Sequence, residues 1–494
     1  MRKFLFPSLL LLFIIPGCKK PSEPGPDLNS GYPAEVSTII NNKCSTTGCH
    51  TASSKAAAGG LSLKTWAELF LGGNGGAVAI AYRPDQSWMT YYTNTDTNKG
   101  VVLVPTMPFN SAPLSATEWQ TLYDWITAGA PNDQGVIPFS GDANRKKFYV
   151  SNQGCDLVSV FDANSKLCMR AINVGQNQAT IDVPHQIRLS PDGQYWYAVF
   201  VNGTVIQKYS AADDSYIGDI PLGDGGADFS AVGYWNTLAI TPDGKYGFAV
   251  DWEDQGKVAV VNLEAMTFMT QYKGLAWPHG SLINSTGTTL YVTSQYGNYI
   301  YKFDISNLNF PSQEQIVLVK GQSPNNNQYF YDPHEVMLSP DESKYFVTCE
   351  ASNEVRVMDA HADTLVAVIP VAEFPLEMGL SKDHNLLFVT CQNEPSDQPK
   401  TEGAVAIIDV STLQVVKTLT AGLYEPHGIG VMDDEGYVVV SSRNLDITGP
   451  APHHVSDCGG RNGYIKFIDL NTLDFIPNYR IEVSVDPYSV AVRP

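Results

Sequence analysis

A repeated strand pattern in the larger, C-terminal part of the chain limits the folds that this sequence can adopt. Runs rich in β-branched and aromatic residues recur at 148–152, 290–294, 345–349 and 387–391. Each is followed by a second run that ends in Asp, and Tyr149 and Asp162 are 13 residues apart, as are Tyr291 and Asp304. No helical periodicity intervenes. A period of about 40 to 60 residues made of strands alone predicts a propeller, a solenoid or an array.

The number of units and the end of the chain predict a closed ring. We count seven units, and residues 487–494 match the first strand of a unit whose remainder opens at Lys147. A C-terminal strand that completes the first unit would leave no free sheet edge. The sequence therefore predicts an all-β, seven-bladed β-propeller over residues 146–494, and its units resemble YVTN-type propeller repeats. This architecture alone does not define a function.

The N-terminus indicates export. Basic residues at 2 and 3 precede an apolar stretch and small residues that lead to Cys18, the layout of a signal peptide over residues 1–17. The sequence Ile-Pro-Gly-Cys at 15–18 resembles a bacterial lipobox, which implies acylation of Cys18; an ordinary signal peptide with a stray cysteine is the alternative. Residues 18–32 would form a tether. We expect a lipid-anchored protein of the cell envelope, periplasmic or on the outer-membrane surface.

Charge and hydropathy exclude two classes of protein. The chain has 31 Lys and Arg against 51 Asp and Glu, a formal net charge of −20, which argues against nucleic acid as a partner. No run of 18 or more apolar residues is present, so no spanning helix is predicted. Membrane contact is expected only through the lipid anchor.

Two thiols and an imidazole lie within seven residues, in Cys44-Ser-Thr-Thr-Gly-Cys49-His50. Such a segment can bond both vinyl groups of a haem and ligate its iron, although the usual attachment spacing is C-x-x-C-H. A local disulfide or half of a zinc site are the alternatives. The zinc site would need more ligands nearby, and the next histidine is His185. The disulfide would leave His50 unexplained.

Two helices are expected around this motif. Apolar residues with helical spacing predict a short helix that leads to Cys44; they are Val36, Ile39 and Ile40. Ser115 and Glu118 form a capping-box pattern at the start of a second helix, which Gly129 would end. Between the helices, Met107 stands between two prolines, and such a stiff segment suits a second axial ligand that raises the haem potential.

These residues resemble a family of small bacterial c-type cytochromes that use the wider C-x4-C-H motif, over about residues 30 to 133. The resemblance implies a small all-α cytochrome c domain at 33–133, followed by a linker at 134–145. It implies thioether bonds from Cys44 and Cys49 to a haem c, with His50 as proximal and Met107 as distal ligand. Met89 is the competing distal candidate, although beside Trp88 it is more typical of a core residue.

Aligned inner strands of the seven units place four histidines in one register. The aligned residues are His185, Asn236, His279, His334, Leu376, His427 and Tyr488. A proline precedes each histidine and stiffens the chain there. Four neutral imidazoles on the axis could bind copper or iron. The plainer interpretation, which we favour at this point, is that each histidine only hydrogen-bonds to a neighbouring blade.

Further polar groups are expected at the same mouth of the channel. They are Glu335, Glu377, Cys349, Cys391, Arg443 and the long loops 394–402 and 444–462, the latter with His453, His454 and Cys458. Without Cys18 and the pair at the haem motif, five cysteines are left, at 155, 168, 349, 391 and 458. Because five is odd, at least one stays free, binds metal or pairs with another chain.

The predicted function is electron transfer by an exported c-type cytochrome lipoprotein whose propeller docks a redox partner protein or a substrate. One alternative is a metal-dependent oxidoreductase with the four-His site on the axis. Another is a non-catalytic extracellular ligand-binding module. No Ser-His-Asp elbow, Gly-rich phosphate loop or flavin fingerprint is present in the sequence.

Overall fold

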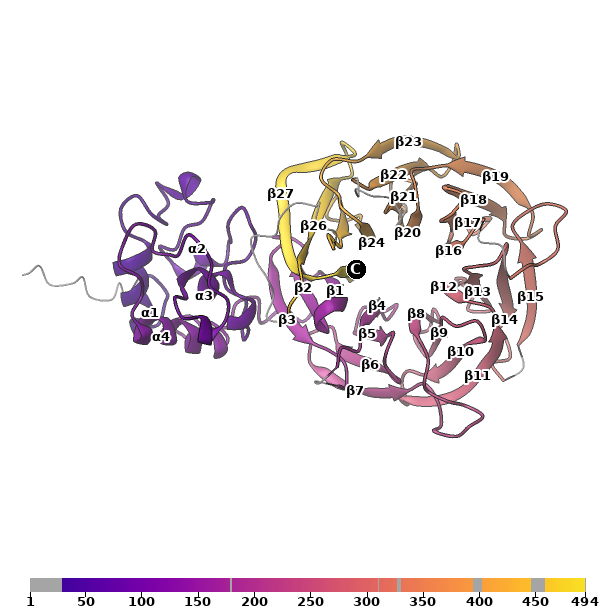
Figure 1. Cartoon of the computed structure of the whole chain (residues 1–494), viewed down its shortest axis with the longest axis horizontal. Helices are drawn as coiled ribbons and strands as arrows, with labels where there is room; N and C mark the ends of the chain where they lie inside the picture. The colour runs from indigo at the N-terminus through magenta and orange to yellow at the C-terminus, as the bar shows by residue number, and fades with distance from the viewer. Residues whose placement is uncertain are drawn as a thin grey trace, which may run out of the picture.

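The computed structural model describes residues 29–177, 180–309, 311–326, 330–393, 402–445 and 458–493. The predicted signal peptide and Cys18 lie outside these ranges. The described chain forms a small N-terminal domain beside a ring of β-sheets (Figure 1). Among the described residues, no helix is both long and apolar enough to cross a bilayer.

The N-terminal domain is built from short helices and long connecting loops. Its elements are α1 (Ala34–Ile39), the π-helical turn η1 (Ile40–Cys44), η2 (Lys55–Ala57), α2 (Trp66–Leu69), η3 (Pro84–Gln86), α3 (Trp88–Thr93), η4 (Thr97–Lys99) and α4 (Ala116–Thr127). The predicted capping box is present: Glu118 N donates to Ser115 Oγ at 3.2 Å, and Ser115 N donates to Glu118 Oε2 at 2.7 Å. Apolar side chains of α1 and α4, among them Val36 and Ile126, share one core.

Seven four-stranded antiparallel sheets form the ring, as the repeat predicts. The first is β28-β1-β2-β3, and the others take their strands in sequence order from β4 to β27. The strands are β1 (Lys147–Asn152), β2 (Leu157–Asp162), β3 (Cys168–Asn173), β4 (Pro184–Leu189), β5 (Tyr195–Phe200), β6 (Val205–Ser210), β7 (Tyr216–Pro221), β8 (Trp235–Ile240), β9 (Tyr246–Asp251), β10 (Gly256–Asn262), β11 (Thr267–Leu275), β12 (Pro278–Ile283), β13 (Thr289–Ser294), β14 (Tyr299–Asp304), β15 (Ser312–Val317), β16 (Pro333–Leu338), β17 (Lys344–Cys349), β18 (Glu354–Asp359), β19 (Leu365–Pro370), β20 (Pro375–Ser381), β21 (Leu386–Cys391), β22 (Ala404–Asp409), β23 (Gln414–Leu419), β24 (Pro426–Met432), β25 (Tyr437–Ser442), β26 (Asn462–Asp469), β27 (Asp474–Val485) and β28 (Pro487–Arg493).

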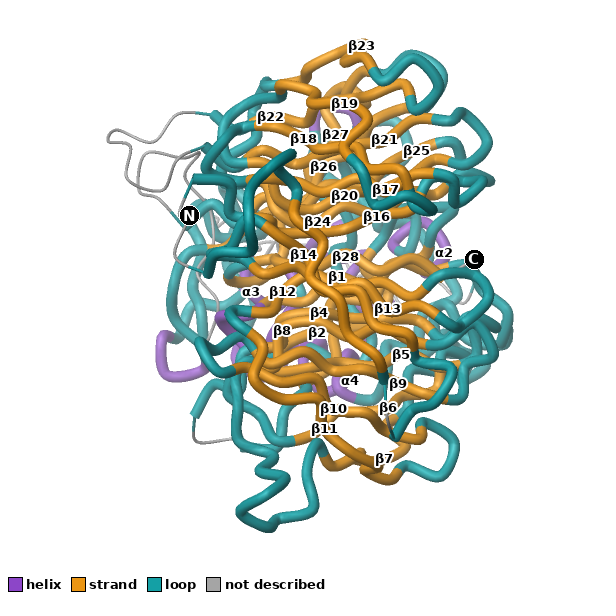
Figure 2. Tube along the Cα trace, turned by 90° about the vertical axis from the view of Figure 1, so that its right-hand side faces the viewer, coloured by secondary structure: helices purple, strands orange, loops and turns teal. Residues whose placement is uncertain are grey.

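The ring is closed by its two ends. Strand β28 pairs antiparallel with β1, with Lys147 opposite Arg493 and Val150 opposite Val490. The last strand therefore becomes the innermost strand of the first blade, and the predicted seven-bladed propeller is confirmed (Figure 1). Figure 2 shows the ring from the side, with its strands between loops on two faces.

The Asp that recurs at the end of the second strand of each repeat has a local cause in the turns. At the end of β18, Asp359 Oδ1 accepts hydrogen bonds from the backbone N–H groups of His361 and Ala362 at 2.9 and 2.8 Å. At the end of β22, Asp409 does the same for Ser411 and Thr412. A carboxylate that satisfies the backbone of the next two or three residues fixes a tight turn, so an Asp recurs where the second strand of a blade ends.

The N-terminal domain packs against the outer strands of the first and last blades, beside β3 and β27 in Figure 1. Ile80 belongs to the same buried apolar cluster as Phe148 and Ile481 of the propeller. Arg83 Nη1 donates to the carbonyl of Ala171 at 2.8 Å and to Asn173 Oδ1 at 3.0 Å. The linker thus joins two domains that share an interface.

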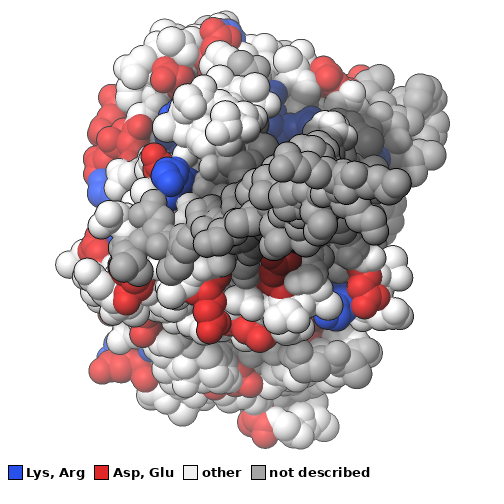
Figure 3. Space-filling model, turned by 90° about the vertical axis from the view of Figure 1, so that its left-hand side faces the viewer, with Lys and Arg blue, Asp and Glu red and all other residues white. Residues whose placement is uncertain are grey.

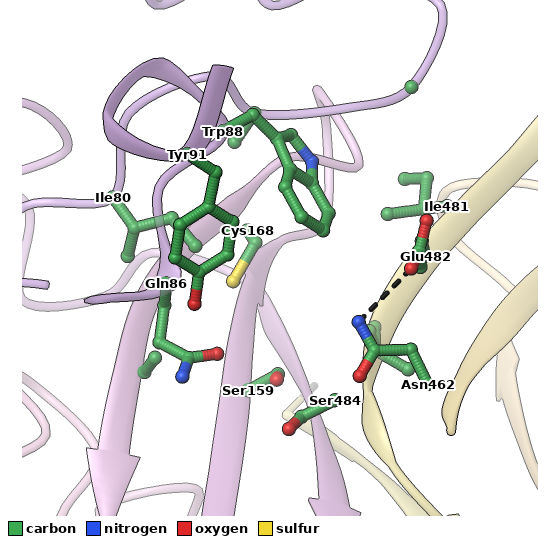
Figure 4. Close-up of a pocket in the computed structure, with 14 residues that line it drawn as sticks. Ile80, Gln86, Trp88, Tyr91, Ser159, Cys168, Asn462, Ile481, Glu482 and Ser484 are labelled. Atoms are coloured by element: carbon green, nitrogen blue, oxygen red, sulfur yellow. Dashed lines mark hydrogen bonds between the residues drawn. The ribbon is translucent and has the colours of Figure 1, made fainter. Parts of the chain in front are cut away.

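A cavity of about 40 Å³ lies within this interface (Figure 4). Trp88 and Tyr91 line it from α3, while Cys168, Asn462 and Glu482 line it from the propeller. Asn462 Nδ2 donates to Glu482 Oε1 at 3.0 Å across its wall. Its volume suits one or two water molecules rather than a cofactor.

Candidate functional site

The predicted haem-attachment segment forms a compact loop at the end of η1. His50 N donates to the Cys44 carbonyl at 3.1 Å, which folds the segment back on itself. Cys44 and Cys49 are half-buried and not bonded to each other, so the local disulfide considered above does not form. Thr46 Oγ1 donates to Cys49 Sγ at 3.3 Å. Burial, together with the neighbouring Cys49, raises the pKa of the Cys44 thiol to about 12.

The surroundings of the His50 side chain favour its neutral form. Its Nδ1 atom is buried and has no hydrogen-bond partner among the residues that the structure describes. Burial lowers the pKa of His50 below its usual value, against a smaller opposite effect of the Leu61 carbonyl. A neutral imidazole is the form that ligates a metal. Two free thiols and a neutral imidazole in one loop therefore fit the donor set of a covalently bound haem.

The two methionine candidates occupy different surroundings. Met89 lies on α3 and is 6 % exposed, inside the apolar core of the N-terminal domain, as its sequence context indicates. Met107 is half-buried on a loop, where its N–H donates to the Tyr92 carbonyl at 2.7 Å. This bond ties the Met107 loop to the end of α3. The role of Met107 as distal ligand stays a prediction.

The predicted register on the propeller axis is confirmed. The aligned residues are the second residues of the seven innermost strands: His185 in β4, Asn236 in β8, His279 in β12, His334 in β16, Leu376 in β20, His427 in β24 and Tyr488 in β28. Six of these strands begin with proline. Five rings form a closed circle, with centroid separations of 5.9 Å (His185–His279), 4.1 Å (His279–His334), 5.8 Å (His334–His427), 3.5 Å (His427–Tyr488) and 4.4 Å (Tyr488–His185).

Glycine allows this close approach of neighbouring inner strands. Gly280 and Gly428 each follow an axial histidine. A Cβ atom at Gly280 would collide with the carbonyl of His334, and one at Gly428 would collide with the carbonyl of Tyr488. A larger residue at either position would push neighbouring blades apart at the axis.

Two of the four histidines have structural hydrogen bonds of the kind that the plainer interpretation predicts. His185 Nδ1 lies 2.8 Å from Gln153 Nε2, and His279 Nδ1 lies 3.3 Å from the His334 carbonyl. Burial lowers the pKa of His185 to about 3 and takes that of His279 well below its usual value. Both rings are therefore neutral parts of the circle.

The other two histidines meet a carboxylate. Ligand atoms of His334, His427 and Glu377 lie within 4.8 Å of one another. Burial takes the pKa of His427 well below its usual value. Burial also disfavours the charged form of His334, but Glu350 and Glu377 together outweigh it and raise the pKa of His334 to about 10. From the sequence we expected Glu377 at the same end of the channel as the histidines, but we did not assign it as a ligand. Glu350, which directly follows Cys349, was not identified from the sequence.

Several other predicted mouth residues have structural roles. Cys349 and Cys391 lie at the expected end of their strands, opposite Pro333 and Pro375, but both are fully buried in blade cores, and burial raises their pKa values. Arg443 pairs with Asp486 at 2.6 and 3.0 Å and lies 4.9 Å over the Tyr488 ring. His453, His454 and most of both long loops lie outside the described residues.

One disulfide links the ends of the ring. Cys155, in η5 (Gln153–Cys155) after β1, is bonded to Cys458, which precedes β26 in the last blade. The structure leaves Cys168, Cys349 and Cys391 as buried free thiols. Of the five cysteines outside the haem motif and the predicted anchor, two form a disulfide and three are buried free thiols. No sequence pattern indicates which of them pair.

No family model matches the chain. A curated relative, Antigen Lp49 of Leptospira interrogans serogroup Icterohaemorrhagiae serovar copenhageni (strain Fiocruz L1-130), is 22% identical over 297 residues, which are 57% of this chain. The match spans 63% of that relative's length.

Solved structures support the fold. A functionally unknown protein from Desulfotomaculum acetoxidans matches with a TM-score of 0.52 at 12% identity, over 70% of this chain and 98% of that chain. A putative 6-phosphogluconolactonase from Bacteroides uniformis matches with a TM-score of 0.52 at 13% identity, over 71% of this chain and 99% of that chain. At such identities the likeness concerns the propeller fold and not an activity.

Proposed function

We propose that this protein is an exported c-type cytochrome lipoprotein that transfers electrons to or from a partner docked on its propeller. The observation that carries the proposal is the loop in which two unpaired thiols, Cys44 and Cys49, precede the neutral and partly buried His50. The thiols would hold the haem by thioether bonds, and His50 and Met107 would ligate its iron. Such a group supplies a one-electron redox couple.

The chain's own residues prepare this loop for a cofactor. The hydrogen bond from His50 N to the Cys44 carbonyl holds the two ends of the motif together, and Leu63 N donates to the His50 carbonyl at 2.9 Å. These backbone bonds order the main chain around His50. A loop that is already ordered loses little conformational entropy when it binds a cofactor.

The Cys155–Cys458 disulfide supports the proposal of export. Disulfides form and persist in oxidising compartments such as the periplasm, and cytosolic thiols are kept reduced. The proposed anchor is Cys18, and the proposed location is the cell envelope. The partner would be a redox protein with a basic contact surface, since the chain carries a net charge of −20 and Asp and Glu groups are spread over the face in Figure 3.

Solvent extraction tests the haem assignment. After acid–acetone treatment of the mature protein, the colour should stay with the polypeptide, and in a Cys44→Ala/Cys49→Ala variant it should not. Cys168→Ala is the matched control because it removes a buried free thiol that lies away from the loop. Haem that is stripped from the unmutated protein, or that is never present, would refute the cytochrome and favour the non-catalytic binding module.

A further inference from the structure

The axial side chains of blades five to seven form a group that the electron-transfer proposal does not use. His334 from β16, Glu377 from β20 and His427 from β24 come from three consecutive inner strands, and their ligand atoms lie within 4.8 Å of one another. His334 and His427 are 3 % and 2 % exposed, whereas the Glu377 side chain is 21 % exposed. The group is therefore buried on the histidine side and partly exposed on the carboxylate side.

Two ring nitrogens in this group make no hydrogen bond to the described residues. His334 Nε2 and His427 Nδ1 are buried and lack a hydrogen-bond partner among the described residues. His334 Nε2 lies 3.8 Å from Glu377 Oε1, a separation too long for a hydrogen bond. Buried ring nitrogens that are left without partners are costly, and an ion between these three side chains would satisfy them together.

A second layer of side chains holds His334 in place. Glu350 contacts the opposite ring nitrogen, His334 Nδ1, through its Oε1 atom. Gln295 Nε2 in turn donates to Glu350 Oε1 and Oε2 at 3.1 and 3.3 Å. Metal-ligating histidines commonly use a carboxylate in this way to fix the ring and its tautomer. The layer directs Nε2 of His334 toward Glu377.

The other two axial histidines are less suited to the same ion. Nδ1 of His185 is occupied by Gln153, and Nδ1 of His279 faces the His334 carbonyl. Neither belongs to the group whose ligand atoms converge. The geometry thus selects two of the four histidines that the sequence aligned, and adds a carboxylate that the sequence did not assign.

We propose that His334, His427 and Glu377 bind one divalent first-row transition ion, Fe(II) or Zn(II), near the axis of the propeller. Two imidazoles and one carboxylate are a ligand set that both ions use when further coordination positions stay open. Those positions would face the channel mouth, where a small ligand could reach the ion. Because only a neutral imidazole ligates a metal, binding would release the proton that Glu350 and Glu377 favour on His334. The proposal does not depend on the haem.

Metal titration of the full-length mature protein tests this site. The protein is dialysed against a chelator and titrated with Zn(II) by calorimetry, and in parallel with Fe(II) under anaerobic conditions. We expect one equivalent of at least one ion per chain. His427→Ala and Glu377→Gln should each weaken its binding at least tenfold, and Glu350→Gln should weaken it between tenfold and a hundredfold through loss of orientation.

His361→Ala is the matched control, because His361 is exposed in the turn after β18, at the opposite end of that blade. It should leave the stoichiometry and affinity unchanged. Glu377→Gln keeps the shape of the side chain, and an unchanged melting temperature would show that the variant is folded. The proposal is overturned if neither ion binds the unmutated chain, or if His361→Ala weakens binding as much as His427→Ala does.

Discussion

Removal of the Cys155–Cys458 disulfide is expected to destabilise the propeller strongly. The bond joins cysteines 303 residues apart and connects the first blade to the last. In the chain-entropy description, a cross-link over such a loop lowers the entropy of the unfolded chain by an amount worth about 6 kcal/mol at 25 °C. Removal of a native disulfide typically costs about 2–5 kcal/mol, so we expect the Cys155→Ser/Cys458→Ser variant to lose about that much unfolding free energy.

The single variants make this test sharp. If the two sulfurs are bonded, either Cys→Ser change removes the same bond, so each single variant and the double variant should have nearly equal midpoints of urea unfolding. Independent cysteines would give losses that add. Midpoints that match the unmutated protein, or losses that add, would refute the reasoning.

A thiol count in denaturant without reductant checks the same bond chemically. The three buried free cysteines, Cys168, Cys349 and Cys391, should react. With haem attached and Cys18 acylated, no further thiol is expected. Two additional thiols in a haem-loaded, acylated sample would show that the disulfide is absent.

Three further predictions concern the haem ligand, the anchor and a buried ion pair. Met107→Ala should remove the near-infrared sulfur-to-iron band and lower the reduction potential. Met89→Ala should keep the band and lower the free energy of unfolding by about 2–5 kcal/mol, because it leaves a cavity in the core. A band that survives Met107→Ala would exclude Met107 as the distal ligand. Cys18→Ser should move the protein from the membrane to the soluble fraction, and unchanged partitioning would count against the lipobox. Lys147 Nζ lies 2.7 Å from Asp214 Oδ2, with both side chains 1% exposed, so Lys147→Met should lower the unfolding free energy by about 3–5 kcal/mol because it leaves a buried charge unpaired. Adding Asp214→Asn should recover part of that loss, and no recovery would argue against the pair; urea unfolding measures both.

The register of the propeller's inner strands could be predicted because each repeat unit has the same spacing between its strands and turns. Each innermost strand places its second residue on the axis, so His185 and Tyr488 could be aligned although they lie in different sequence contexts. The capping box of Ser115 and Glu118 could be predicted for a similar reason, since it depends on residues that are three positions apart. Local spacing decides both features.

Features that depend on contacts between blades could not be predicted. Cys349 and Cys391 end their strands at the expected mouth, but a blade is covered on both faces by its neighbours, and β17 and β21 are buried almost throughout. No alternation of polar and apolar residues then shows where a side chain points. The approach of Glu350 and Glu377 to His334 has the same origin, because it is set by how consecutive blades pack.

The closure of the ring by β28 also determines when the protein can fold. Arg493 Nη1 donates to the Arg145 carbonyl across a sequence separation of 348 residues. The first blade therefore lacks its innermost strand until the end of the chain is available, and such distant pairing makes folding slow. Until then, β1 in the first blade exposes an unpaired strand edge that can join other chains. The chain is therefore most open to such pairing between the emergence of Lys147 and the arrival of Arg493.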